Sequence, residues 1–291
     1  MAEAMVIADS RGAARVTEQT PFSPTDEVLR DIARGGISGA IVGIAVGGLG
    51  GRAVMRIAAI LHPDAVGALT ENGNRIGDIT AGGSLFLIIF GLISCAIAGA
   101  IWVIVSPWIP GRTALRALLT AGLAIAIGTP FLIIGGNPDF VILGHDPRVV
   151  ALLVALVGLI GLSIALVDSW LDRRLPHAVP GRKGPVVLYA TVTVMGAVLV
   201  LPFVLLVLLT SDEYHLPLRA GYALLVVGLS TATLWGLRVR GRVSTPRGLM
   251  IAARGALLAA MVLGILTTAP HLSRALGASV PAEAVAASGS G

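Results

Sequence analysis

The sequence predicts an all-α, polytopic helical membrane protein with about seven transmembrane helices and its N-terminus inside. Three observations lead to this class. Hydrophobic residues make up 55% of the 291 residues, charged residues only 13%, and the mean hydropathy is +0.89, whereas a soluble domain carries about 25% charged residues. The apolar residues are gathered into long blocks. The basic residues are concentrated in every second connection between the blocks.

The apolar blocks set the number of spans. A stretch of about 20 apolar residues crosses the hydrocarbon core of a bilayer as a helix. We find seven such blocks, at about 36–61, 84–107, 117–135, 149–168, 186–209, 220–237 and 249–270.

The remaining segments are mostly short connections, so no separate soluble domain is expected. The predicted organisation is a mobile extension over 1–22, an interfacial amphipathic helix over 23–34, a transmembrane domain over 35–271 and a mobile tail over 272–291. In the amphipathic helix, Ser23 and Asp26 form a capping box, and Arg30 and Arg34 are expected to reach lipid headgroups.

Basic residues indicate the orientation, because short cytoplasmic loops are enriched in Lys and Arg. Of the 21 Lys and Arg, 14 fall in the N-terminal segment and in the second, fourth and sixth connections. Only four, Arg75, Arg148, Arg219 and Arg274, fall in the opposite connections and tail. The pI of about 10.3 then follows from topology and from anionic lipid at the inner face, and nucleic acid is not expected as a partner.

The stretch GAIVGIAVGGLGG, residues 39–51, has two interpretations. Gly48, Gly50 and Ala53 fit a dinucleotide-binding fingerprint, but that fingerprint requires a strand, a helix and a second strand. The favoured interpretation is a groove on one face of the first membrane helix, where small residues four apart let another helix pack closely. The groove could face a helix of the same chain or a second copy. Its residues are Gly35, Gly39, Gly43, Gly47 and Gly51.

Arg52 and Arg56 suggest a polar site. They lie four apart beside the glycines, and an Arg at the bilayer centre costs about 2.5–3.5 kcal/mol on insertion scales. One interpretation is a buried or cavity-lining site in which they pair with loop carboxylates. The other is that both snorkel to the outer interface. The candidate site comprises Arg52, Arg56, Glu71, Asp78, Asn137 and Asp139.

The sequence predicts no catalytic residues, no cofactor and no metal ligands. His62, His145, His215 and His271 fall at the outer ends of spans, but their spacing matches no metal motif and favours solvated positions. Cys95 is the only cysteine, which excludes an intramolecular disulfide. No G-x-S-x-G or Walker sequence occurs.

The stretch GGRAVMRIAAILHPDAVGALTENGNRIGDITAGGSLFLIIFG and the later NPDF resemble a group of polytopic membrane proteins of unassigned function from high-GC bacteria. The resemblance is clearest over residues 36–175. It implies a bacterial cell (inner) membrane and a defined first outer loop, and it implies no activity.

Two functional classes follow. The first is a non-catalytic membrane component or scaffold, packed through the glycine groove and able to form a homo-oligomer or to bind another membrane protein. The alternative is a transporter or permeation protein with an Arg-lined site near the outer face. Seven spans do not divide into two equal inverted halves, which favours the first class over common transporter architectures.

Overall fold

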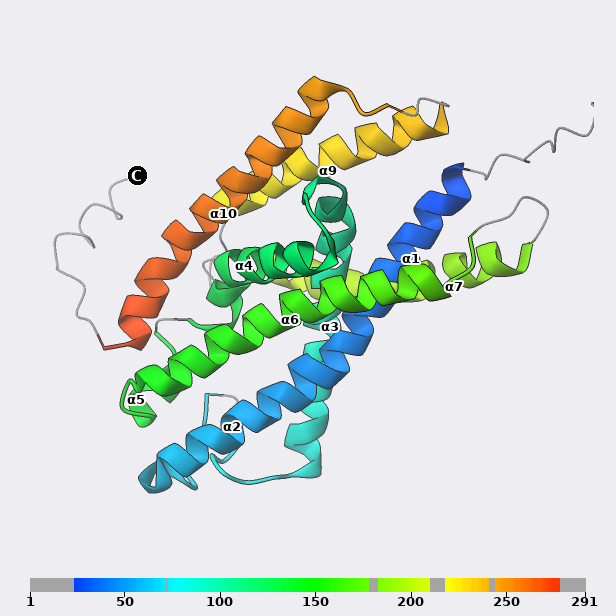
Figure 1. Ribbon diagram of the computed structural model, residues 1–291. Helices are drawn as coiled ribbons and strands as arrows, with labels where there is room; N and C mark the ends of the chain where they lie inside the picture. The colour runs from blue at the N-terminus through cyan, green and yellow to red at the C-terminus, as the bar shows by residue number, and fades with distance from the viewer. Residues whose placement is uncertain are drawn as a thin grey trace, which may run out of the picture.

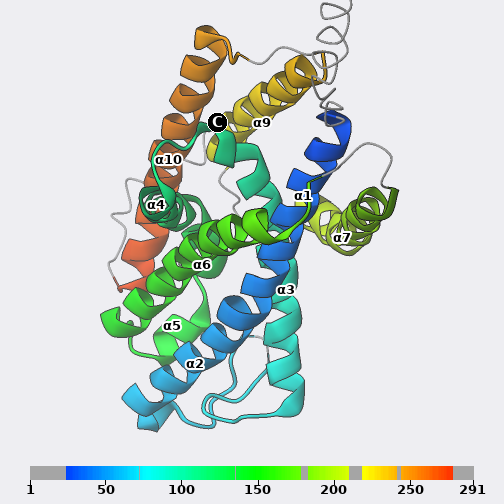
Figure 2. The ribbon, with the colours of Figure 1, turned by 45° about the vertical axis from the view of Figure 1, so that its right-hand side comes forward.

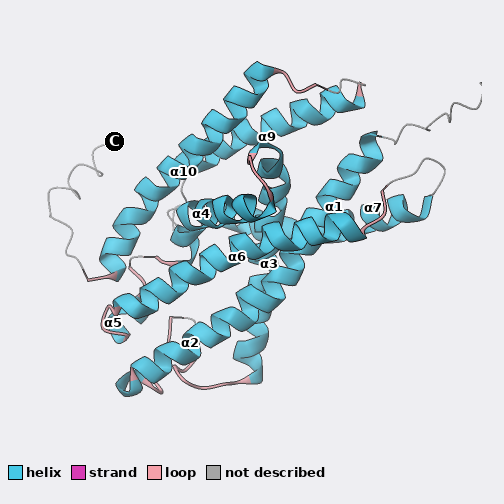
Figure 3. Cartoon of the chain, viewed as in Figure 1, coloured by secondary structure: helices cyan, strands magenta, loops and turns pink. Residues whose placement is uncertain are grey.

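The structure is a computed structural model that describes residues 24–71, 73–134, 136–177, 183–209, 218–240 and 244–277. These ranges fold into helices joined by loops, with one isolated bridge between Leu69 and Arg75 (Figure 3). They contain seven helices long and apolar enough to cross a membrane. The predicted all-α, polytopic fold class is therefore confirmed.

The first span is one uninterrupted helical run of three elements. These are α1 (Pro24–Val42), the π-helical η1 (Gly43–Gly48) and α2 (Leu49–Leu61). The other helices are α3 (Ala81–Val105), α4 (Thr113–Leu132), the short α5 (Pro138–Ile142), α6 (Pro147–Arg174), α7 (Lys183–Leu209), α9 (Leu218–Val239) and α10 (Arg247–Ala275).

Packing is tightest in three helix pairs, α4 with α6, α1 with α3, and α9 with α10. The α9–α10 pair lies side by side in both views (Figures 1 and 2). The main core joins α3, α4, α6, α9 and α10 around Trp102, Trp108 and Ile164. The α7 helix lies against α1 at the edge of the bundle (Figure 2).

The glycines of the first span lie against α3 of the same chain. A Cβ atom built on Gly39 would overlap the carbonyl oxygen of Cys95, and one on Gly43 would lie 2.5 Å from the carbonyl oxygen of Gly91. Gly35 and Gly47 also face α3. Because backbones meet directly here, side chains at these positions would force the two helices apart.

We name this contact of the first span with α3 the glycine seam. Gly51 does not belong to it. No atom lies within 4 Å of a Cβ built there, whereas one on Gly48 would lie 2.8 Å from the Cα of Ile88. The π-helical turns of η1 explain the difference, since i→i+5 turns hold more residues than α-helical turns and shift the register of the helix face. The four-residue repeat therefore predicts Gly51 at this contact, whereas Gly48 occupies it.

The helix expected over 23–34 is not a separate helix. It begins at Pro24 as predicted but continues straight into the first span, while Ser23 and the extension 1–22 lie outside the described residues. At the other end, α10 runs on to Ala275. The helical part of the chain therefore extends beyond the predicted limits of 35 and 271.

Candidate functional site

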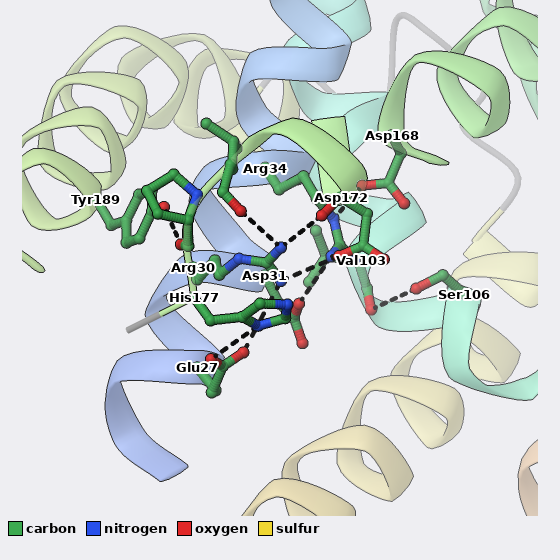
Figure 4. A network of polar contacts seen from close by, with 12 residues as sticks. Glu27, Arg30, Asp31, Arg34, Val103, Ser106, Asp168, Asp172, His177 and Tyr189 are labelled. Carbon is green, nitrogen blue, oxygen red and sulfur yellow. Dashed lines mark hydrogen bonds and ion pairs between the residues drawn. The ribbon is translucent and has the colours of Figure 1, made fainter. Parts of the chain in front are cut away.

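The largest group of charged contacts joins α1 to α6. We name Glu27, Arg30, Asp31, Arg34, Asp168 and Asp172 the charge cluster (Figure 4). Nε of Arg34 lies 2.7 Å from Oδ1 of Asp168, and its Nη1 contacts Asp172 and lies 3.3 Å from Asp31. Both helices repeat their charges every four residues, so the pairs meet face to face along the crossing.

Arg30 is almost fully enclosed, with 2% of its side chain exposed. Its Nη1 lies 3.0 Å from Oδ1 of Asp172, and its Nη2 donates to the carbonyl oxygens of Asp172 and Leu175. These carbonyls lie in the last turn of α6 and at the residue that follows it, where a cation also interacts favourably with the helix dipole. Arg30 therefore caps the C-terminal end of α6 from the side of α1.

This arrangement corrects one expectation. Arg30 and Arg34 were expected to reach lipid headgroups, but their guanidinium groups point into the protein and bind α6. Ionisable side chains within membrane-spanning helices usually face the bundle interior and pair with one another. The amphipathic pattern of 23–34 thus reflects packing within the bundle.

The charge cluster holds an excess of negative charge. It contains four carboxylates and two guanidinium groups, and His177 adds its Nδ1 3.3 Å from Oε1 of Glu27. A cavity of about 20 Å³ lies beside it, lined by Asp31, Arg34, Asp168 and the indoles of Trp102 and Trp235. A cavity of that size has room for about one water molecule.

Sequence reasoning missed the charge cluster, although a signal was present. Asp168 and Asp172 lie in the segment DSWLDRR, whose Trp170 and two arginines are typical of the end of a membrane span. Two acids four apart on one helix and two arginines four apart on another form complementary faces. Sequence alone does not show which two helices cross, so the match was not apparent.

The predicted outer polar site lies at the opposite end of the first helix. Nη2 of Arg52 donates to the carbonyl oxygen of Asp78 at 2.7 Å, and Nη1 of Arg56 donates to that of Gly77 at 3.2 Å. The first helix therefore binds the backbone of the loop that follows it.

The partners of the two arginines differ from the prediction. Within the described ranges, neither guanidinium lies within 4 Å of a carboxylate oxygen, so the expected pairing with Glu71 or Asp78 side chains is wrong. The tight turns at Gly73 and Gly77, both with positive φ, bring main-chain carbonyls toward α2. A carbonyl oxygen accepts hydrogen bonds from a guanidinium group and, unlike a carboxylate, carries no net charge.

A separate pair of hydrogen bonds joins Glu71, Asn137 and Asp139 and does not involve the two arginines. The backbone N–H of Glu71 donates to Oδ1 of Asp139 at 2.9 Å, and the backbone N–H of Asp139 donates to Oδ1 of Asn137 at 2.7 Å. Asn137 thereby caps α5. These bonds tie the first loop to the third connection.

We name residues 62–71, 73–80 and 136–146 the loop platform. Beneath it, Ile76 of the first loop packs with Ala58, Ala59, Leu143 and Val149 in one apolar cluster. The two connections are therefore joined through a small core as well as through hydrogen bonds. Such packing makes the loop platform a folded surface, in contrast to two independent loops.

Asp146 links the loop platform to the start of α6. Its carboxylate accepts three contacts from the Arg148 side chain and one from the Arg148 backbone N–H, and it lies 2.9 Å from Nε2 of His62. These hydrogen bonds, chiefly those of the Arg148 side chain, hold the pKa of the Asp146 carboxyl well below its usual value. The carboxylate is therefore charged over the whole physiological pH range.

The histidines expected at the outer ends of the spans serve as local contacts. Nδ1 of His145 lies 3.0 Å from the carbonyl oxygen of Ala275, while His271 is buried and His215 lies outside the described residues. In the part of the chain that the structure describes, no three His, Cys, Asp or Glu side chains are grouped as metal ligands.

The loop platform also carries apolar side chains that nothing in the described chain covers. Ile79 is 70% exposed, Val141 66%, Leu69 58% and Val66 52%. The first loop of the loop platform also carries the exposed acids Asp64, Glu71 and Asp78 and one exposed base, Arg75. An apolar surface with a mostly acidic rim is typical of an interaction surface.

Together, fold and polar contacts define an integral membrane protein with two built polar regions, one at each end of its first helix. Comparison with known proteins adds no narrower identity: no family, no curated protein and no solved structure matches the chain.

Proposed function

We propose that this chain is a non-catalytic component of a bacterial cell membrane that binds another membrane protein through the loop platform. The membrane-spanning class rests on the seven apolar helices. The bias of basic residues supports a cytoplasmic N-terminus, with the loop platform on the outer side. The excess of Arg over Lys and the resemblance to proteins from high-GC bacteria support the bacterial membrane.

The observation that carries this proposal is the combination of rigidity and exposed apolar surface. Arg52 and Arg56 hold the loop backbone, Asp139 joins the two connections, and Ile76 anchors them to the helices. Leu69 and Val141 nevertheless point away from this core. A preorganised surface loses little conformational freedom on binding, which favours association.

The charge of the loop platform defines the partner's chemistry. Its exposed acids outnumber its exposed bases, so a partner with apolar side chains surrounded by Lys or Arg would be complementary. The glycine seam is occupied by α3 of the same chain. The occupied glycine face supports a partner surface on the loops and not on the first helix.

Site-specific photocrosslinking in living cells tests this proposal. A benzophenone amino acid placed at Leu69 or Val141 is expected to crosslink to one discrete membrane protein. The matched control is Leu258, which is 62% exposed on the membrane-spanning α10. Adding Glu71→Lys to the Leu69 variant should weaken the crosslink, because it reverses the charge of the rim.

The outcomes are distinct. A discrete product from Leu69 and Val141 that fades with Glu71→Lys supports partner binding by the loop platform. Products identical to those of Leu258, or lipid adducts alone, would show that these apolar side chains contact the bilayer and would overturn the proposal.

A second candidate is a proton-coupled permeation protein, favoured by the charge cluster. Ionisable side chains within membrane-spanning helices often mark ion or proton pathways. Here carboxylates exceed guanidinium groups beside a cavity at one end of the bundle. Purified protein in liposomes should then carry a proton flux that Asp168→Asn abolishes and Asp64→Asn, on the exposed loop, leaves intact. Equal flux in both variants and in empty liposomes would remove this candidate.

A further inference from the structure

A pair of arginines lies where α4 and α10 meet the turn that follows α3. That turn, Ser106–Trp108, receives two arginines from different helices. Nη2 of Arg116 donates to the carbonyl oxygen of Ser106 at 2.8 Å, and Nε of Arg254 donates to that of Trp108 at 3.3 Å. Two guanidinium groups are thus held around one three-residue turn.

The helices behind these arginines fix their positions. Ala117 and Ala253, the chain neighbours of the two arginines, are both buried in the main core with Trp108. Arg116 also lies over the Trp102 ring, 5.5 Å from its centroid. Packing and a cation–π contact therefore hold the guanidinium of Arg116 beside the turn Ser106–Trp108.

The charge of these two guanidinium groups is unbalanced. Neither α4 nor α10 contains an Asp or Glu, and within the described ranges neither guanidinium lies within ion-pair distance of a carboxylate. Each makes one hydrogen bond to a carbonyl through one of its three nitrogens. A guanidinium has five N–H donors, so both retain donors for an anion.

The position of Arg116 and Arg254 along the membrane normal suits a lipid headgroup. With 20 residues, α4 is about 30 Å long, which matches the hydrocarbon core of a bilayer. Its first residue therefore lies at headgroup level, and Arg112 and Arg116 lie at or within one turn of it. Arg254 reaches the same level because it binds the turn just before α4.

We infer that Arg116 and Arg254 form a binding site for the phosphate of an anionic phospholipid, with Arg112 at its rim. Guanidinium groups bind phosphate oxygens through paired, charge-assisted hydrogen bonds. Basic pockets between membrane helices are a known form of lipid-headgroup site. This inference is independent of the proposed partner, which would bind at the other end of the molecule.

Lipid binding to the purified full chain tests the inference. In a neutral detergent, phosphatidylglycerol, phosphatidylcholine and inorganic phosphate are each titrated while bound lipid is counted by native mass spectrometry and the thermal midpoint is recorded. Phosphatidylglycerol should bind and raise the midpoint. Arg254→Gln should weaken that binding at least about tenfold, the scale of one lost charge-assisted hydrogen bond.

Two variants act as controls. Arg274→Gln removes an exposed Arg from the far end of the same helix, α10, and should leave phosphatidylglycerol binding unchanged. Arg254→Lys keeps the charge but not the paired geometry and should fall between wild type and Arg254→Gln. Because Arg254 is exposed at the surface, its variants are expected to fold even if Arg116 variants do not.

Three results would overturn the inference. Equal binding of phosphatidylcholine would show that no anion is recognised. An equal loss in Arg274→Gln would show a diffuse charge effect. The same gain with inorganic phosphate alone would indicate a site for a free anion in place of a lipid.

Discussion

Arg34 on α1 and Asp168 on α6, 134 residues apart in the chain, form a 2.7 Å ion pair that is largely closed to solvent. The pair lies at the centre of the charge cluster and borders its cavity. It joins the first and fourth spans at the end of the bundle where α1 begins. The first effect of the charge cluster is to fix this crossing of α1 and α6.

Breaking the Arg34–Asp168 pair should destabilise the fold strongly. Asp168→Leu removes the most buried of the carboxylates that contact the guanidinium of Arg34, and breaking a buried pair costs about 3–5 kcal/mol. The double variant Arg34→Met with Asp168→Leu should recover most of that loss, because apolar replacement removes both charges. Unfolding in mixed detergent micelles measures the three free energies. Additive losses in the double variant would show that the two side chains do not act as a pair.

The glycine seam gives a second prediction. Gly39→Ala should lower the free energy of unfolding by about 1–3 kcal/mol, because its Cβ would overlap the Cys95 carbonyl oxygen and force α1 away from α3. Gly36→Ala is the matched control: nothing lies within 4 Å of its Cβ. That change should be neutral or stabilising by up to about 1 kcal/mol. Similar losses at both positions would contradict direct backbone packing.

Asp146 gives a prediction about pH. Its pKa is lowered in the folded state by Arg148 and His62, so the unfolded chain binds its proton at a higher pH than the folded chain does. The stabilisation is therefore complete well above the ordinary value of 3.8 and is lost as the pH falls below it. Thermal midpoints from pH 7 to pH 3 should fall less steeply below pH 4 in Asp146→Asn than in wild type. Parallel curves would show that Asp146 does not contribute.

The seven spans could be predicted from the sequence because length and hydropathy determine them. The predicted 84–107, for instance, corresponds to α3 over Ala81–Val105. The limits of the first span were harder, since Arg30 and Arg34 resemble interfacial residues until α6 supplies their acids. Residue pattern describes one helix at a time, whereas the charge cluster depends on which helices cross.

The contacts of Arg52 and Arg56 could be predicted only in part from the sequence. Arg52 and Arg56 do bind the loop that follows the first helix, but through carbonyl oxygens of Gly77 and Asp78. A sequence lists side chains as candidate partners and does not show which main-chain groups a turn will present. The shift from Gly51 to Gly48 has a similar origin, because π-helical turns leave no clear mark in residue pattern.

Thiol labelling in intact cells tests most directly the central claim, that the loop platform stands on the outer side of a membrane-spanning bundle. With Cys95 replaced by Ala, single cysteines are introduced at Arg75 on the loop platform and at Arg173 near the end of α6, both exposed at the protein surface. An impermeant maleimide should label Arg75→Cys in intact cells and Arg173→Cys only after the membrane is opened. Labelling in the reverse order would contradict the orientation and the proposed partner surface.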